Sequence, residues 1–173
     1  MLLLPGLSSC QTAAHTAAET ETVSIFPPTD SLVAGIPIYA TFPEIEPLLH
    51  QQNDTTYLIN FWATWCKPCV EELPFFEAVH TKLEGKPFKV ILVSLDFPAQ
   101  IESSLVPFVA KNQLRSQVLV LLDGKYNNWI DKVSPEWSGA LPATYLYRNN
   151  EVRFKGSSFK DLAELEAFID PLL

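Results

Sequence analysis

The chain has 173 residues, of which 47% are hydrophobic and 18% are charged, and its formal net charge is −8. This length suits one domain with an extension and excludes two ordinary domains, while the apolar fraction excludes wholesale disorder. An acidic chain is a poor nucleic-acid binder, because phosphate contacts need clustered Lys and Arg, and its 3 Cys are too few for a disulfide scaffold.

The first nine residues are uncharged and rich in Leu, and Cys10 follows them. They look like the end of a signal peptide, although they are too short to span a bilayer and lack a positive n-region. Leu7-Ser8-Ser9-Cys10 resembles a bacterial lipoprotein box, which implies cleavage before Cys10 and its acylation. We therefore expect residues 1–9 to be a signal remnant, translation to start upstream or the sequence to be truncated, and Cys10 to anchor the protein to a membrane. The alternative is a chance apolar start with a free thiol.

Residues 10–35 are rich in Ala, Thr, Glu, Ser and Pro and contain few large apolar side chains. Such a stretch cannot bury enough surface to offset the entropy of ordering, so we predict a flexible, lipid-anchored tether. Its end is more apolar, at Ile25-Phe26, and we expect this end to pack as an edge segment. The folded domain is then expected over residues 36–173.

From residue 36 onward, strand and helix patterns alternate. Apolar steps of three and four predict helices, and continuous apolar runs predict strands that are buried on both faces. The expected elements are a helix over 42–51, a strand over 55–62, a helix over 67–83 with a kink at Pro74, a strand over 88–95, a helix over 101–112, a strand over 118–122, a short helix over 126–133, strands over 144–147 and 151–154, and a helix over 161–169. Asn149-Asn150 predicts a hairpin between the last two strands. The order favours an α/β fold with a mixed sheet, in which three helix-connected strands are parallel and the hairpin is antiparallel.

The informative segment, residues 60–69, reads Asn-Phe-Trp-Ala-Thr-Trp-Cys-Lys-Pro-Cys. It begins in a strand and ends in a helix, so Cys66 and Cys69 lie within disulfide distance on the first helical turn. The helix N-terminus favours a thiolate, and we expect the pKa of Cys66 to fall from about 8.5 toward roughly 7. Lys67 adds a positive charge, and Pro68 fits an early helical position. Cys69 should be the more buried cysteine.

This asymmetry predicts a redox pair in which Cys66 attacks a substrate disulfide and Cys69 resolves the mixed disulfide. The alternatives are a zinc site, for which the CxxC supplies two of four ligands, a structural disulfide, and chance core cysteines. A redox pair needs no metal and no organic cofactor.

Residues 61–69 resemble the active-site stretch of thioredoxin-fold proteins, and Val-Glu-Glu-Leu-Pro at 70–74 resembles the TlpA/ResA-like branch of extracytoplasmic thiol-disulfide oxidoreductases. Leu141-Pro142-Ala143-Thr144-Tyr145 resembles the second landmark of that family. The resemblance implies a thioredoxin fold with helices on both faces of the sheet. It also implies a cis peptide bond at Leu141–Pro142, with both residues positioning an extended substrate beside Cys66. Trp65 is expected to shape the same groove, or else to be purely structural.

The chain also departs from this pattern. Cytoplasmic thioredoxins have a buried Asp where this chain has Asn60, and Asn cannot accept a proton from Cys69. Glu72 is the nearest candidate for that role, although a Glu on a helix is more often a solvated charge. Lys67 replaces a Glu that some relatives carry between the cysteines, which should favour the thiolate.

The expected function is a thiol-disulfide oxidoreductase of the cell envelope that reduces the disulfides of exported proteins. By family analogy its partners would include a membrane thiol-disulfide electron donor and apocytochrome c. We expect a monomer. The rival interpretations are a disulfide oxidase and a metal-binding module on the same fold. A thiol peroxidase is disfavoured, because the chain lacks the Pro-x-x-x-Thr-x-x-Cys pattern.

Overall fold

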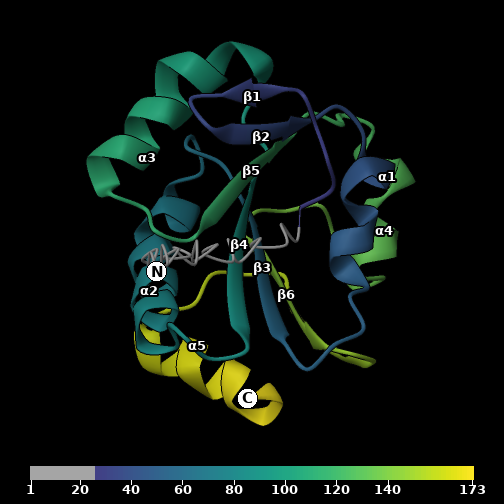
Figure 1. Cartoon of the computed structure of the whole chain (residues 1–173), viewed down its shortest axis with the longest axis vertical. Coiled ribbons are helices and arrows are strands. Elements are labelled where there is room, and N and C mark those ends of the chain that lie inside the picture. The colour runs from purple at the N-terminus through teal and green to yellow at the C-terminus, as the bar shows by residue number, and fades with distance from the viewer. Residues whose placement is uncertain (1–25) are drawn as a thin grey trace, which may run out of the picture.

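A seven-stranded sheet forms the centre of the protein, as a computed structural model covering residues 26–173 describes (Figure 1). The strands lie in the order β1-β2-β5-β4-β3-β6-β7. Their bounds are β1 (Leu32–Val33), β2 (Ile36–Tyr39), β3 (Thr56–Trp62), β4 (Phe88–Ser94), β5 (Gln117–Leu121), β6 (Ala143–Arg148) and β7 (Glu151–Lys155). Strands β2, β5, β4 and β3 run parallel, whereas β6, β7 and β1 pair antiparallel with their neighbours.

Helices cover both faces of the sheet (Figure 1). The helices on one face are α2 (Lys67–Lys82), α3 (Val106–Asn112) and α5 (Leu162–Ile169), and those on the other are α1 (Phe42–Ile45) and α4 (Ile130–Val133). Side chains of β3 alternate between two apolar clusters, with Leu58 and Trp62 in one and Ile59 and Phe61 in the other. Every residue of β3 is buried, which explains its continuous apolar run. The architecture confirms the predicted α/β thioredoxin fold.

Three predicted helices are less regular than their apolar spacing indicated. The first ends at Ile45 and continues as a 3-10 helix, η1 (Glu46–Leu49), because Pro47 has no N–H to donate. The third begins as a π-helix, η3 (Ile101–Leu105), before α3. The fourth divides into a 3-10 turn, η4 (Tyr126–Asn128), and α4. The hairpin turn forms where Asn149-Asn150 predicted it, with Asn149 at φ 53°.

The sheet extends into the segment assigned to the tether. Strand β1 pairs with β2, and the Tyr39 hydroxyl donates a hydrogen bond to the Pro27 carbonyl at 2.7 Å. The end of residues 10–35 therefore packs at the edge of the sheet. The lipidation candidate Cys10, the signal remnant and the first part of the tether lie outside the described residues. Between residues 26 and 173, no helix is long and apolar enough to cross a membrane.

Candidate active site

The two cysteines of the CxxC segment form a disulfide at the start of α2, directly after the loop that follows β3. Cys66 is the N-cap residue of the helix, and its Cα lies 5.3 Å from that of Cys69. Cys66 keeps 6% of its surface exposed, whereas Cys69 is fully buried. A partner can therefore reach the disulfide only from the Cys66 side.

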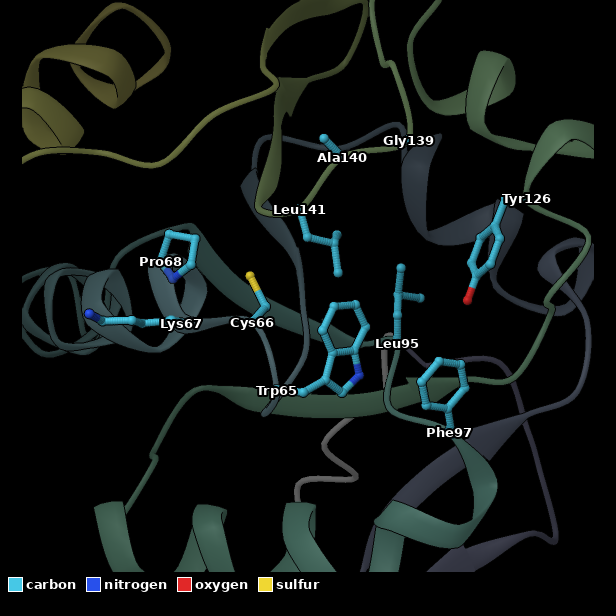
Figure 2. Close-up of a pocket in the computed structure, with 10 residues that line it drawn as sticks. All are labelled: Trp65, Cys66, Lys67, Pro68, Leu95, Phe97, Tyr126, Gly139, Ala140 and Leu141. Carbon is cyan, nitrogen blue, oxygen red and sulfur yellow. The ribbon is translucent and has the colours of Figure 1, made fainter.

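The positive charge predicted beside Cys66 is directed elsewhere. Figure 2 shows the Lys67 amino group pointing away from the Cys66 sulfur. The Lys67 side chain is 86% exposed, and its Nζ lies 3.6 Å from Oε1 of Glu71. Solvent and this carboxylate therefore screen the Lys67 charge. Stabilisation of a Cys66 thiolate thus rests chiefly on the N-terminus of α2, a helix of 16 residues.

The Pro142 loop lies beside the cysteines. The Leu141–Pro142 peptide bond is cis, and β6 begins at the next residue. Because Ala143 pairs with Phe61 in the β3–β6 ladder, the loop falls next to the end of β3 that leads to Cys66. The buried Trp137 donates its ring N–H to the Ala140 carbonyl at 2.8 Å, which supports the loop from the core.

A pocket of about 580 Å³ opens beside Cys66 (Figure 2). Sequence reasoning placed Trp65, Cys66, Lys67, Pro68 and Leu141 at the site, and all five line it. The other lining residues are Leu95, Phe97, Tyr126, Gly139 and Ala140.

Three of the lining residues that sequence reasoning missed follow β4 and β5, the two parallel strands that lie in order beside β3. Leu95 and Phe97 come after β4, and Tyr126 comes after β5. The carboxyl ends of parallel strands meet at one edge of a sheet, where α/β proteins bind their ligands. The prediction that these strands are parallel therefore carried a signal for these positions.

Glu72 is buried, contrary to the expectation of a solvated helical charge, with 1% of its surface exposed. Its carboxylate accepts hydrogen bonds from the Asn60 side-chain amide at 3.1 Å and from the Phe159 N–H at 2.8 Å. The Asn60 amide also donates to the Thr144 hydroxyl at 3.0 Å. Burial raises the pKa of Glu72 from 4.5 to about 7, because the two hydrogen bonds only partly offset desolvation. Glu72 can therefore exchange a proton near neutral pH.

A second buried carboxylate, Asp96, holds the loop between β3 and α2, and sequence reasoning missed it. It accepts hydrogen bonds from the Thr64 N–H at 3.1 Å, from the Thr64 hydroxyl at 2.5 Å and from the Ser94 hydroxyl at 2.8 Å. Asp96 is 1% exposed, so these bonds replace water around its charge. The bonds fix the backbone two residues before Cys66.

Metal-ligating side chains are scattered over the part of the chain that the structure describes. His, Cys, Asp and Glu do not gather there in any group of three or more that could hold a metal ion.

The fold and the CxxC disulfide define a thioredoxin-like protein. The profile of the AhpC/TSA family matches residues 47–155, and the chain belongs to this family.

Curated relatives extend the resemblance seen in the sequence. Thiol-disulfide oxidoreductase ResA from Oceanobacillus iheyensis is 27% identical over 116 residues, covering 66% of this chain and 56% of that protein. Sporulation thiol-disulfide oxidoreductase A from Bacillus subtilis is 29% identical over 68 residues, covering 39% of this chain and 40% of that protein. The chain thus spans about half the length, or less, of the curated relatives that it matches.

Solved structures show the same fold. A putative thiol:disulfide interchange protein DsbE from Chlorobium tepidum is similar over 69% of this chain and 80% of its own, with a TM-score of 0.56 and 24% identity. A thioredoxin-related protein from Neisseria meningitidis serogroup B is similar over 70% of this chain and 87% of its own, with a TM-score of 0.59 and 16% identity. Together with the relatives, they confirm the resemblance to thioredoxin-fold thiol-disulfide oxidoreductases.

The hydrogen bonds of Asp96 predict a stability effect. Asp96→Ala should lower the free energy of unfolding by about 2–3 kcal/mol, because it leaves the buried Ser94 hydroxyl and the partly buried donors of Thr64 without an acceptor. Urea unfolding of the disulfide form measures this change. The exposed Glu102→Ala is the matched control, with an expected change within about 0.5 kcal/mol. Equal stabilities of the two variants would contradict the role given to Asp96.

Proposed function

We propose that the protein is a thiol-disulfide oxidoreductase that reduces disulfide bonds of polypeptide substrates. The observation that carries this proposal is the Cys66–Cys69 disulfide at a helix N-terminus, with one sulfur reachable from an open pocket and the other fully buried. A structural disulfide has no need of such a pocket. The names of the relatives support the same chemistry.

The first step forms a mixed disulfide. In the reduced protein the Cys66 thiolate attacks one sulfur of the substrate disulfide, so that a Cys66–substrate S–S bond forms and the substrate S–S bond breaks. The leaving substrate sulfur departs as a thiolate and takes a proton from water. Leu141 lines the same pocket as Cys66 and is joined to Pro142 by a cis peptide bond, and the backbone of these two residues is proposed to align an extended substrate segment.

The second step releases the substrate. The Cys69 thiol loses its proton, and the thiolate attacks the Cys66 sulfur, which re-forms the Cys66–Cys69 disulfide and frees the second substrate sulfur. The substrate has then gained two electrons and two protons, which the dithiol has lost. A dithiol donor must restore the reduced protein for the next cycle.

Glu72 is proposed to accept the Cys69 proton, directly or through one water. The two residues are three apart on α2 and so are neighbours on one face of the helix. Because the pKa of Glu72 is raised to about 7, its carboxylate is a much better proton acceptor than an ordinary glutamate. Asn60 keeps this carboxylate in place through its amide and does not itself take the proton.

The cellular setting is part of the proposal. We assign the protein to the extracytoplasmic side of the envelope, tethered to a membrane through acylated Cys10. Its substrates would be exported disulfide-containing proteins, with apocytochrome c as one such substrate, and a membrane thiol-disulfide protein would supply electrons. The lipoprotein-box pattern and the TlpA/ResA-like motifs support this assignment.

The reduction potential of the Cys66–Cys69 couple tests the direction of the reaction. A reductase predicts a value near about −270 mV, measured by equilibration with glutathione or dithiothreitol and quantification of free thiols. A value near about −120 mV would instead make the protein a disulfide oxidase. Zinc or copper titration of the reduced protein is the parallel test for the metal-binding alternative.

Cysteine variants test the two roles. Cys66→Ser should abolish reduction of insulin disulfides in a turbidity assay, because it removes the cysteine of the pair that lines the pocket. Cys69→Ser should still attack substrate but accumulate a Cys66–substrate mixed disulfide, visible as a mass increase on a non-reducing gel. Full insulin reduction by Cys66→Ser would rule out the proposed function.

The role of Glu72 predicts a pH dependence. In the wild type, breakdown of the mixed disulfide should accelerate as the pH rises through about 7, because the Glu72 carboxylate is then free to take a proton. Glu72→Gln should slow this step roughly 100-fold and remove that inflection. Single-turnover reduction of a chromogenic disulfide resolves the step.

Glu71→Gln is the matched control for this prediction. It changes the adjacent residue of α2, whose side chain is 64% exposed. This variant should keep the wild-type rate and pH profile. If Glu72→Gln and Glu71→Gln showed the same rate and pH profile of mixed-disulfide breakdown, Glu72 would be excluded as the proton acceptor.

A further inference from the structure

The pocket beside Cys66 has two exposed aromatic rings at its mouth. The Trp65 and Phe97 rings stack nearly parallel, with centroids 5.9 Å apart and an angle of 12° between their planes. Trp65 is 50% exposed, Phe97 is 55% exposed, and Tyr126 nearby is 38% exposed. Six large apolar side chains are this exposed in residues 26–173, and three of them line this pocket. Such a gathering marks a binding surface.

The backbone that carries the aromatic pair is held by hydrogen bonds, of which those to Asp96 are partly buried. Trp65 follows Thr64 directly and Phe97 follows Asp96 directly, so the Asp96–Thr64 hydrogen bonds tie together the two backbones that carry the rings. On its other side, Phe97 accepts a hydrogen bond from the Gln100 N–H at 2.8 Å. The rings are therefore fixed before a partner arrives, which lowers the entropy cost of binding.

The charge distribution restricts what can occupy this part of the pocket. Lys67 is the only charged residue among those that line it, and its amino group points away from the aromatic rings (Figure 2). The Trp65 ring lies between Cys66 and Phe97, with Leu141 and Leu95 beside it, and the polar side-chain groups there are the Trp65 indole nitrogen and the Tyr126 hydroxyl (Figure 2). A charged side chain placed here would lose water without gaining an ionic partner.

We propose that Trp65, Phe97, Tyr126 and Leu95 form a specificity subsite for one large apolar side chain, preferentially aromatic, of the substrate polypeptide. This inference rests on the proposed function, because the mixed disulfide with Cys66 is what brings the substrate to the pocket. Once the substrate cysteine is bonded to Cys66, the neighbouring substrate residue lies over the subsite. The protein thus selects disulfides whose cysteine is followed or preceded by an aromatic residue and rejects those flanked by acidic residues.

Three peptide substrates test the subsite with the full chain and dithiothreitol as the regenerating donor. Each is a self-quenched fluorescent disulfide dimer of one peptide, and the three differ only in flanking the cysteine on both sides with Phe, Ala or Asp. We expect kcat/KM for the Phe peptide to exceed that for the Ala peptide by about 10-fold or more, and the Asp peptide to be the poorest. Phe97→Ala should bring the Phe-to-Ala ratio close to one, whereas Phe97→Tyr should keep it.

Val152→Ala is the matched control, because Val152 is also 50% exposed but lies on β7 and does not line the pocket. This variant should keep the wild-type ratio. Equal rates for the three peptides, or an unchanged ratio in Phe97→Ala, would overturn the subsite while leaving the reductase function intact. A wild-type dimer that Phe97→Ala dissociates would also overturn it, since the rings would then bind a second copy. Reduction of none of the peptides would contradict the proposed function, and with it the subsite.

Discussion

Burial of β3 on both faces is the constraint on which the rest of the site depends. The strand lies between β4 and β6, and its side chains alternate between the two apolar clusters. Leu58 and Trp62 face the α2 side, so Asn60 faces it as well and meets Glu72 there. The same strand delivers the chain to Cys66 at the start of α2. The alternation of side chains along β3 thus places Asn60 against the Glu72 carboxylate, and the end of the same strand leads to Cys66.

Two buried carboxylates serve this arrangement in different ways. Asp96 receives several hydrogen bonds from nearby donors and stabilises a loop. Glu72 is pressed into an apolar cluster with fewer donors, so desolvation dominates and its pKa rises. Glu72 therefore owes its raised pKa to burial that its hydrogen bonds only partly offset.

Local sequence was enough to predict the part of the site that is encoded locally. The CxxC pair follows a recognisable strand and begins a recognisable helix, so the sequence alone predicted Cys66, Cys69 and Trp65 at the site. The burial of Glu72 could not be predicted, because it depends on the Phe159 N–H, which is 87 residues away in sequence. Asp96 and Phe97 follow another strand, and their meeting with Thr64 and Trp65 depends on strand order rather than on local pattern. The apolar spacing predicted one helix over 42–51, whereas Pro47, which has no N–H, already indicated the break that the structure shows after Ile45.

The two outer strands of the sheet bear on how the protein can meet other chains. Strand β1 has only two residues, and β7 carries Glu151, Arg153 and Lys155 along its length. A short edge and a charged edge both discourage a foreign strand from extending the sheet. The partners proposed for this protein are exported polypeptides, which can bring strands of their own. The two outer strands therefore disfavour aggregation with a substrate through extension of the sheet.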